Sequence, residues 1–552
     1  MKRDFPRLGE GPFDLLVIGG GIYGAWAACD ATRRGLRTAL VEKNDWASGT
    51  SSASSKLLHG GLRYLERLHL GLVRTSLNER ARMAALAPHL VRPVKFLLPV
   101  YRGDRVGRLG LRAGLTLYDL LGGGRPPFRP HEALSPGRIR ERAAFLTPEG
   151  LKGGFTYGDC VMDDARIALE VVAAAVGAGC TAVNGAEALS LAVEGGRVRG
   201  ARIRDGSDGR EIDVAAQMTL CCAGAWTGRL LEEARQPAPE VTISRGTHLV
   251  MPALPTSDAM LLQTRTDGRI IFLIPWYGRT LLGTTDRVDG GNPDDLVPGS
   301  DDADYLLAEA GRFMAGAPWS RRTVAGSFAG LRVLRGRAGD SPSALGREWS
   351  MEAHLPGLLV PVGGKYTSAR ADAAKLVDRA LHLMGRPHVP ATTAAEPLPW
   401  APAGEFSSWL AASIVEGRAG GLDGMAAETS ARRAGRGFPE ILELIRGDSS
   451  LAARIHPELP FCRAEAILCA RGEMVRNLED LARRRIPVSI LAPMTAVVAA
   501  DLAALAGAEL GWDEARRRDE AASVMEGAGP VGLRERRPAP AGAAGHRSEH
   551  GR

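Results

Sequence analysis

The sequence predicts an α/β fold in which a parallel sheet is interrupted by an inserted antiparallel sheet and followed by an all-helical domain. Three observations predict it. An apolar strand that ends in a glycine-rich turn opens the chain. Residues 241–286 alternate apolar and polar side chains, as antiparallel strands do, and residues 406–526 have helical periodicity throughout. The 552 residues are enough for two or three domains with a large core.

The glycine-rich turn reads Gly19-x-Gly21-x-x-Gly24 and follows an apolar run over 15–18. Gly19 permits the tight turn, Gly21 lets a pyrophosphate approach the backbone, and Gly24 lets the next helix lie close to the sheet. The phosphates would lie at the positive end of the helix dipole. Glu42 ends the next apolar strand, where it can bind ribose hydroxyls. Because all these parts are in register, the segment predicts a Rossmann-like dinucleotide site.

Two later strands indicate that the dinucleotide is FAD. One strand ends at Cys222-Ala-Gly224-Ala-Trp226, and another over 358–362 is followed by Gly363-Gly364-Lys365. Such strand ends are typical of a second and a third visit of the chain to one flavin, and an NAD domain has no need of the third. Because the strand over 358–362 belongs to the same domain as the first strand, the substrate-binding sheet must be inserted between two parts of the FAD-binding domain.

The expected domain organisation is therefore discontinuous. The expected boundaries are 12–100, 150–240 and 325–385 for the FAD-binding domain, 101–149 and 241–324 for the substrate-binding domain, 386–405 for a linker, 406–526 for the helical domain and 527–552 for a disordered tail. The linker is rich in Pro and Ala, and the composition of the tail cannot bury a core.

Composition limits the partners. The net charge of +7 fits an anionic substrate or an acidic membrane surface and is too small to imply nucleic acid. The seven cysteines are odd in number and lack partners at ligand spacing, so we expect neither a disulfide framework nor a metal site. No apolar signal core or membrane-spanning run is present, so we expect a cytoplasmic protein whose membrane contact is peripheral. Residues 105–121 mix arginines with leucines, which suits a membrane interface; a packed helix with a solvated edge explains them equally well.

Several segments carry a family resemblance. The most specific is TSSASSKLLHGGLRYLE over 50–66, and it is joined by YGDCVMDDARIAL over 157–169 and VGGKYTSAR over 362–370. Over residues 12–525 the chain resembles the aerobic, quinone-linked, FAD-dependent glycerol-3-phosphate dehydrogenases. The resemblance implies a D-amino-acid-oxidase-like plan and oxidation of sn-glycerol 3-phosphate to dihydroxyacetone phosphate, with hydride transfer from C2 to flavin N5. It also implies electron transfer to quinone at the inner face of the cytoplasmic membrane.

The sequence departs from the family's pattern in a few places. Val333 follows Arg332 where the family usually has proline, and Arg335 and Arg337 stand in a loop that is often acidic. The arginine run at 483–485 continues into Ile486-Pro487, and the strand before Gly224 reads CCAG rather than NATG or NAAG. These departures leave FAD binding expected and bear on the substrate and the electron acceptor.

Three cations are candidates for the reaction. A dianionic phosphate favours arginine, whose planar fork binds two oxygens, so we expect substrate-binding and catalytic roles for Arg63 and Arg332. A surface salt bridge for Arg63 and a structural ion pair for Arg332 are the alternatives. Lys365 is expected at the start of a helix, where a cation opposes the helix dipole unless an anion lies nearby. The flavin N1–C2 carbonyl region or a substrate oxyanion would supply that anion.

Four further residues complete the expected substrate side. His248, on a strand, suits a general base, and a core histidine fits equally well. Tyr64 and Thr367 are expected to line the substrate pocket, with simple packing and a helix cap as the respective alternatives. Asp286 is expected to orient an Arg or Thr rather than to touch substrate.

Most of the residues expected to contact FAD lie in the glycine-rich turns and the 50–61 segment, and Glu42, Lys43 and Ala188 lie on or after predicted strands. The whole set is Gly19, Gly20, Gly21, Ile22, Tyr23, Gly24, Glu42, Lys43, Thr50, Ser51, Ser52, Leu58, His59, Gly60, Gly61, Ala188, Gly224, Trp226, Gly363, Gly364 and Lys365.

Other functions stay open at this stage. A glycerol-phosphate oxidase or an amine or amino-acid oxidase would use oxygen on the same two-domain plan. An FAD-dependent protein acting on RNA would need a basic, aromatic platform, and the basic residues here are dispersed. A catalytically dead scaffold would not need Arg63, Arg332 and Lys365. A homodimer is one alternative for the oligomeric state.

Overall fold

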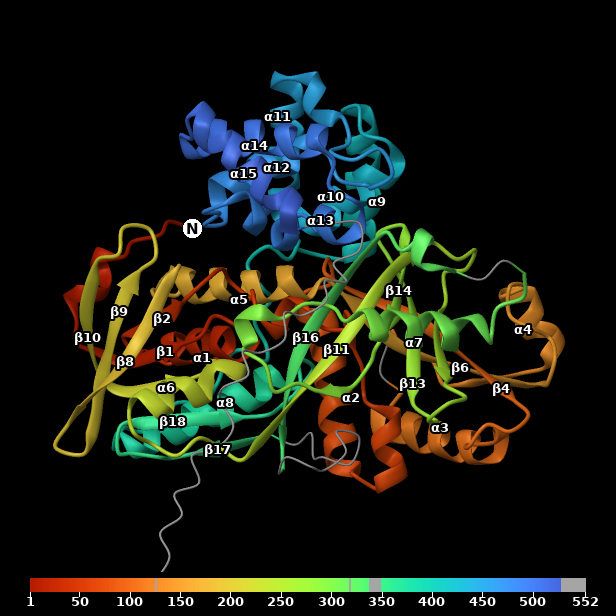
Figure 1. Cartoon of the computed structure of the whole chain (residues 1–552), viewed down its shortest axis with the longest axis horizontal. Coiled ribbons are helices and arrows are strands. Elements are labelled where there is room, and N and C mark those ends of the chain that lie inside the picture. Colours follow the sequence, from red (N-terminus) through yellow and green to blue (C-terminus); the bar gives the residue numbers. More distant parts are fainter. Residues whose placement is uncertain (125–126, 317–318, 337–348, 528–552) are drawn as a thin grey trace, which may run out of the picture.

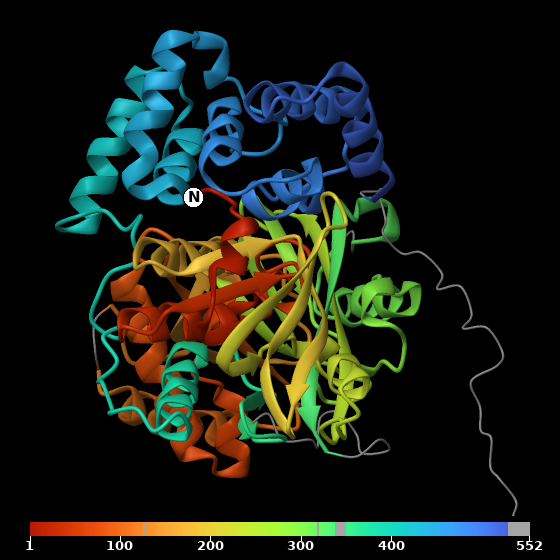
Figure 2. The ribbon, with the colours of Figure 1, turned by 90° about the vertical axis from the view of Figure 1, so that its left-hand side faces the viewer.

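The structure, a computed structural model, describes residues 1–124, 127–316, 319–336 and 349–527. Two mixed sheets lie beside each other, and a helical domain lies across one side of both (Figure 1). The N-terminus lies against this helical domain (Figure 2), where the Met1 ammonium donates a hydrogen bond to the Gly472 carbonyl at 2.6 Å. The tail at 528–552, expected to be disordered, lies outside the described residues.

The first sheet has a parallel core with β1 at its centre. β1 pairs in parallel with β2 and β10, and parallel pairing continues to β7 and β18. Its strands are β1 (Phe13–Ile18), β2 (Thr38–Glu42), β7 (Thr181–Asn184), β8 (Ala186–Glu194), β9 (Arg197–Asp205), β10 (Glu211–Cys221), β17 (Ser350–Glu352) and β18 (Leu358–Val362). Apolar residues of β1 are buried on both faces, which explains why the strand reads as a continuous apolar run.

The second sheet is mostly antiparallel. Its strands are β3 (Leu57–Leu58), β4 (Val91–Tyr101), β5 (Glu132–Leu134), β6 (Leu151–Met162), β11 (Val241–Pro252), β12 (Ala259–Gln263), β13 (Ile270–Trp276), β14 (Arg279–Gly283), β15 (Arg287–Val288) and β16 (Gly326–Arg335). The alternation over 241–286 is confirmed, because β11, β14 and β13 pair antiparallel in that order.

Four strands belong to a different sheet from the one that the expected boundaries imply. β3, β4, β6 and β16 lie in the second sheet, although the expected boundaries place them in the FAD-binding domain. β4 pairs with β6 along its whole length, and β16 pairs with β11. An apolar strand reads the same in either sheet, and only its pairing partners decide where it lies.

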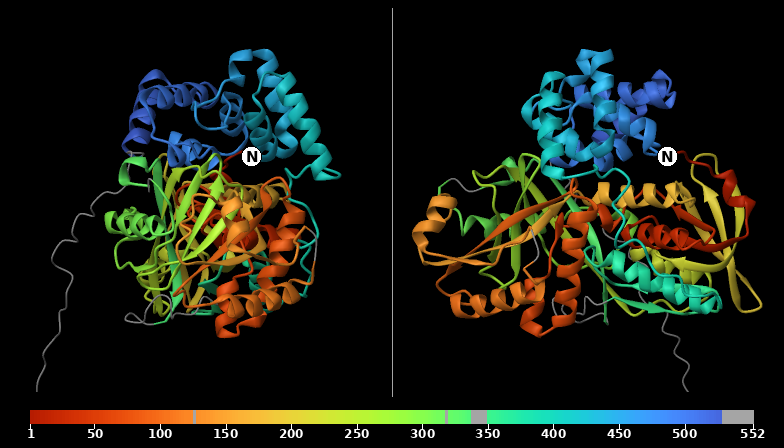
Figure 3. Two further views of the ribbon diagram at one scale, coloured as in Figure 1. Left: turned by 90° about the vertical axis from the view of Figure 1, so that its right-hand side faces the viewer. Right: turned by 180° about the vertical axis from the view of Figure 1, so that it is seen from behind.

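Helices pack on both sheets and build the C-terminal domain. In the α/β part they are α1 (Ile22–Arg33), α2 (Leu70–Leu86), α3 (Arg108–Gly122), α4 (Pro136–Arg142), α5 (Asp164–Gly177), α6 (Thr227–Glu233), α7 (Ser300–Gly311) and α8 (Ala369–Leu383). In the C-terminal domain they are α9 (Phe406–Ala419), α10 (Gly424–Ala434), α11 (Phe438–Gly447), α12 (Arg463–Gly472), α13 (Val488–Leu491), α14 (Ala496–Leu510) and α15 (Glu514–Gly527). α1 packs between α5 and α8, and Figure 3 shows the C-terminal helices gathered on one side of the two sheets.

Within 406–526, where helical periodicity is expected throughout, the helical structure is interrupted after α12. α12 ends at Gly472, Met474 adopts a φ of 52°, and a short π-helix resumes at Asp480–Arg485. The interruption lets Glu473 pair with Arg166 of α5 at 2.8 Å, while its carbonyl accepts a hydrogen bond from Arg485 at 2.7 Å. The pattern of apolar residues could not reveal this break, because they are buried on both sides of it.

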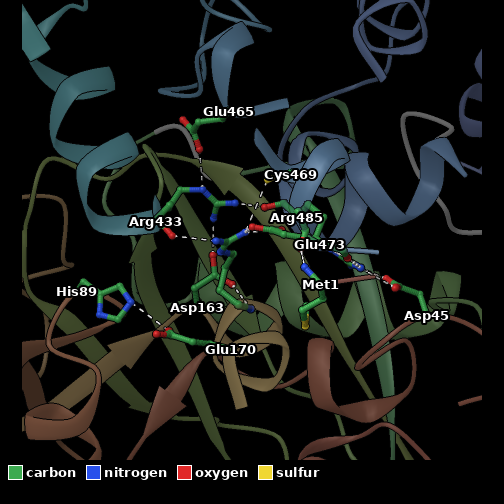
Figure 4. A network of polar contacts seen from close by, with 12 residues as sticks. Met1, Asp45, His89, Asp163, Glu170, Arg433, Glu465, Cys469, Glu473 and Arg485 are labelled. Atoms are coloured by element: carbon green, nitrogen blue, oxygen red, sulfur yellow. Dashed lines mark hydrogen bonds and ion pairs between the residues drawn. The ribbon is translucent and has the colours of Figure 1, made fainter. Parts of the chain in front are cut away.

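Buried ion pairs join the helical domain to the α/β part (Figure 4). Asp45 accepts hydrogen bonds from Arg485 at 2.6 and 2.8 Å and also contacts Arg484. Asp163, at the end of β6, pairs with Arg433 at 2.5 Å. Burial alone would raise the pKa of Asp45, but the two guanidinium groups hold it well below its usual range. Removing one partner of such a pair costs about 3–5 kcal/mol, so these contacts fix the domains against each other.

Candidate active site

A cavity of about 700 Å³ lies where the two sheets meet. Ile18, Val41 and Pro361 line it from the first sheet, and Phe96 and Phe272 line it from the second. Its volume is in the range of small-molecule and cofactor sites. Most of the expected site residues line it, namely Gly19, Gly21, Ile22, Tyr23, Glu42, Lys43, Thr50, Ser51, His59, Gly61, Arg63, Tyr64, Ala188, Gly224, Trp226, His248, Arg332, Gly363, Gly364, Lys365 and Thr367.

The remaining expected contacts are buried behind the lining. They are Gly20, Gly24, Ser52, Leu58 and Gly60. A Cβ at Gly24 would lie 1.9 Å from the Gly19 carbonyl oxygen, and one at Gly60 would lie 2.5 Å from the Tyr118 hydroxyl. Gly24 and Gly60 therefore need to be glycines so that the chain can pack closely beneath the cavity wall.

The first turn has the conformation that its glycines predict. Gly19 has a φ of +108°, which favours glycine, and Gly21 precedes the first residue of α1. The Ile22 amide donates a hydrogen bond to the Ser51 hydroxyl at 2.8 Å. The 50–66 segment thus lies directly against the N-terminus of α1, where a pyrophosphate would be bound.

Glu42 lies at the end of β2. Its carboxylate accepts hydrogen bonds from the Gly20 amide at 2.7 Å and the Asn44 amide at 2.9 Å. Burial raises the pKa of Glu42. Lys43 lies over the Trp226 ring, 4.7 Å from its centroid. This edge of the first sheet forms the end of the cavity expected to hold the adenosine ribose.

His248 also lines the cavity and lies on β11. Its Nε2 is 2.9 Å from the Ser55 hydroxyl, and its ring stacks on Phe328. Burial, with the charges of Arg332 and Lys56, holds the pKa of His248 well below its usual value. The ring is therefore neutral near pH 7 and can accept a proton. Its Nδ1 is buried with no hydrogen-bond partner among the described residues.

Arg332 lies beside His248, on β16. Its guanidinium donates to the Thr284 hydroxyl at 2.8 Å and the Thr285 carbonyl at 3.1 Å, and lies 3.5 Å from the Asp286 carboxylate. Asp286 thus contacts an arginine, and its orienting role stays a prediction. A Cβ at Gly246, on β11, would lie 2.1 Å from the Arg332 guanidinium. Arg332 therefore forms an ion pair with Asp286 and also lines the cavity, so both expected roles fit its position.

Lys365, Tyr64 and Thr367 lie together near the turn after β18. The Lys365 ammonium lies 3.5 Å from the centroid of the Tyr64 ring. The Thr367 hydroxyl accepts a hydrogen bond from the His59 amide at 3.4 Å, and α8 begins only at Ala369. Lys365 is thus four residues before the helix rather than at its start. The helix dipole therefore acts less strongly on Lys365 than expected. Lys365 lies at the site because it directly follows the glycine turn.

The described residues fit a bound FAD. The glycines at 19, 21 and 364 leave the cavity wall bare of side chains where a dinucleotide would lie closest. Glu42 would hold the ribose, and the turn at Gly363–Lys365 would face the flavin ring.

Several residues that shape the site were missed by the sequence reasoning. Ser55 contacts His248, Phe328 stacks on it, and Thr284 holds Arg332. Ser55 lies in the most specific motif, which was a usable signal. Phe328 and Thr284 had none, because their proximity arises only from pairing of strands that are far apart in the sequence.

Family models match most of the chain. Residues 14–370 match the model described as FAD dependent oxidoreductase. Residues 391–517 match the model described as the C-terminal domain of alpha-glycerophosphate oxidase. Together these matches cover both the cavity and the helical domain.

Relatives agree over the same length. The chain is 35% identical to glycerol-3-phosphate dehydrogenase 2 of Mycobacterium tuberculosis, over 94% of this chain and 88% of that protein. It is 32% identical to the mitochondrial glycerol-3-phosphate dehydrogenase of Mesocricetus auratus, over 92% of this chain and 72% of that protein. The glycerol-3-phosphate dehydrogenase of Bacillus halodurans, solved with FAD, superposes with a TM-score of 0.78 at 27% identity, over 96% of this chain and 98% of that one. On these matches, with the cavity that fits its cofactor, the chain is an FAD-dependent oxidoreductase and belongs to the glycerol-3-phosphate dehydrogenase family.

Proposed function

We propose that this protein oxidises sn-glycerol 3-phosphate to dihydroxyacetone phosphate and passes the electrons to a quinone. The observation that carries the proposal is the convergence of Arg63, His248, Arg332 and Lys365 on one cavity with the flavin turns. Three cations match a dianionic substrate, and a neutral histidine matches the alcohol proton that must be removed. The named substrate of the relatives has this chemistry.

The roles divide by chemistry. Arg63 and Arg332 bind the phosphate, and Tyr64 and Thr367 line the space around the glycerol carbons. His248 accepts the hydroxyl proton, and the contact of its Nε2 with the Ser55 hydroxyl holds the ring in place. Lys365 stabilises negative charge that develops on the substrate oxygen. Bound FAD supplies the acceptor, at N5, for the hydride that leaves carbon 2.

A second feature supports quinone as the acceptor and the membrane as the location. A largely apolar cavity of about 340 Å³ lies between α3 and the segment 62–66, and shares Arg63 and Leu261 with the main cavity. On α3 the side chains of Leu109 and Leu120 are 85% and 73% exposed. Exposed leucines next to Arg108 and Arg112 suit the surface of an anionic membrane. No described helix is long and apolar enough to cross a membrane.

Anaerobic flavin bleaching tests the substrate. The purified yellow protein is mixed with glycerol 3-phosphate without oxygen, and the oxidised flavin band is followed. We expect rapid bleaching by this substrate and none by glycerol or by amino acids. A flavin that stays oxidised would contradict the proposed substrate.

Oxygen is the competing acceptor, and the match of the helical domain to a model named for an oxidase favours testing it. The rate at which the bleached enzyme is reoxidised is measured in air-saturated buffer and, separately, with a soluble quinone under nitrogen. Faster reoxidation with the quinone than with oxygen supports the dehydrogenase. Reoxidation by oxygen at a rate equal to that with the quinone, with one peroxide formed per flavin reoxidised, supports the oxidase.

A further inference from the structure

A buried lysine lies behind the proposed base. Lys56 is 1% exposed, and its ammonium pairs with the fully buried Asp164 at 2.6 Å. The same ammonium contacts the Ser52 carbonyl and lies 5.0 Å from the centroid of the Phe328 ring, which stacks on His248. A buried ammonium is costly unless it is paired and hydrogen-bonded, and the arrangement satisfies both conditions.

Asp164 also holds the segment that carries Ser55. One of its oxygens accepts hydrogen bonds from the Ser54 amide at 3.1 Å and the Ser54 hydroxyl at 2.6 Å. The Ser54 hydroxyl in turn accepts one from the Lys56 amide at 3.0 Å. The residues on both sides of Ser55 are therefore fixed to one carboxylate, and Ser55 is held at 2.9 Å from His248 Nε2.

The position of Asp164 is itself fixed. It is the first residue of α5 and follows Asp163, which pairs with Arg433 of the helical domain (Figure 4) and accepts a hydrogen bond from Tyr277 at 2.9 Å. The Tyr366 hydroxyl donates to the Asp164 carbonyl at 2.6 Å. Contacts from three separate parts of the chain thus converge behind the base.

We propose that Lys56 and Asp164 are a positioning pair that fixes the Ser55–His248 hydrogen bond and sets the electrostatic environment of the imidazole. Neither residue is expected to touch the substrate. The charged groups acting on the ring from the elements packed against it are Lys56 and Arg332, and Arg332 is partly neutralised by Asp286. Gly283, on β14, presents no side chain to the ring.

The pair has a predictable electrostatic effect. Burial and the charge of Arg332 lower the pKa of His248, and the Lys56 cation lowers it further because it disfavours a second positive charge nearby. If Lys56 is removed, the pKa of His248 rises whether Asp164 stays ionised or becomes protonated. Protonated His248 cannot accept the substrate proton, so the rate should fall at a higher pH than in the wild type. This step rests on the proposed role of His248 as base.

The test uses the double variant Lys56→Met/Asp164→Asn in the full-length holoenzyme. This variant leaves no buried charge unpaired and keeps an oxygen acceptor for Ser54. We expect bound FAD to be retained and the acidic limb of the flavin-reduction rate to move up by about 1 pH unit. The matched control is Asp30→Asn/Arg34→Met, which removes another buried ion pair, at 2.6 Å, whose members do not line the cavity. The control should leave the acidic limb unchanged.

A second readout does not depend on catalysis. In histidine-labelled holoenzyme, the NMR signals of His248 are assigned by their loss in His248→Gln and are titrated with pH. The double variant should raise the titration midpoint of His248, and the control should not. An unchanged midpoint would overturn the positioning pair even if His248 proves not to be the base. A raised midpoint together with wild-type reduction by His248→Gln would support the pair and contradict the proposed base.

Discussion

The ring of His248 stacks on the ring of Phe328, with centroids 4.8 Å apart and planes inclined by 9°. The two residues are directly opposite each other in the pairing of β11 with β16. On its other side His248 is paired with Gly283, where a Cβ would lie 2.2 Å from the imidazole. Strand register on both sides therefore fixes the plane of the proposed base. A base fixed in this way keeps its angle to the substrate without a reorganisation step.

Replacing the imidazole tests this role. His248→Gln should lower the rate of flavin reduction by about 10²–10⁴-fold, the usual contribution of a general base, because glutamine cannot accept the hydroxyl proton. FAD absorbance should be retained, because the expected FAD contacts do not include His248. Stopped-flow reduction under nitrogen measures the rate. Phe328→Leu should lower the rate less, because it removes the stacking partner but keeps the imidazole of His248. Equal losses of rate in both variants would point to misfolding instead.

Arg332 is expected to act through substrate affinity. Arg332→Met should raise the KM for glycerol 3-phosphate about 10–100-fold, the value of one or two charge-assisted hydrogen bonds. Gly246→Ala offers an independent route to the same defect. Its new Cβ would displace only the flexible end of Arg332, so the fold should survive while KM rises. Steady-state kinetics, with rates normalised to the amount of bound flavin, would measure the KM of both variants. A wild-type KM in both variants would show that Arg332 does not bind the phosphate.

The sequence predicted well what local chemistry decides. The turn at Gly19–Gly24, the acid at Glu42 and the turn at Gly363–Lys365 all meet at one cavity, because each sits at the end of a strand in the same parallel sheet. Carboxyl ends of parallel strands share one edge, so their residues come together without knowledge of distant contacts.

The sequence predicted poorly what strand pairing and buried charge decide. The partners of β4 and β16 could not be read from apolar patterns, so the domain boundaries around 100, 150 and 325 differ from the sheets. The break after Gly472 depends on Arg166, which is about 300 residues away along the chain. Lys56 stood in a recognised motif, but nothing local indicated that it pairs with Asp164.

Lys365 should matter for the chemical step rather than for affinity. Lys365→Met should slow flavin reduction about 10²-fold, as loss of one preorganised charge at a developing oxyanion does. The KM should change less than in Arg332→Met, because Lys365 is expected to stabilise charge that appears only as the reaction proceeds. Rapid-mixing reduction at saturating substrate measures this rate. A reduction rate equal to that of the wild type would rule out the electrostatic role.

The buried pairs of the helical domain predict a specific acid response. The pKa of Asp45 is lower in the folded chain than the ordinary value near 3.9. Its contribution to stability is therefore complete above about pH 4 and is lost as the pH falls through the folded-state pKa. Asp45→Asn should lower the Tm at pH 7 and make the loss of stability below pH 4 less steep. Glu132→Gln, which breaks an exposed pair with Arg138, is the control and should change neither.

Gly364 provides a test of the flavin turn. Its φ is +104°, and a Cβ there would lie 2.0 Å from the Tyr23 hydroxyl, which donates a hydrogen bond to Asp372 at 2.7 Å. Gly364→Ala should strain the turn and displace Tyr23, so that FAD binds at least about tenfold more weakly, the result of losing about 1.4 kcal/mol. Fluorescence titration of the apoprotein with FAD measures the dissociation constant.

The matched control for this substitution is Gly71→Ala in α2. Gly71 has no atom within 4 Å of its Cβ position and no positive φ, so alanine fits a helix there without strain. This variant should keep the wild-type affinity for FAD and gain about 0.5–1 kcal/mol in free energy of unfolding. If both variants weaken FAD binding alike, the effect is a general one on the fold and the turn at Gly364 has no special part in holding the cofactor. If Gly364→Ala alone weakens it, the close approach of that turn to Tyr23 is the cause.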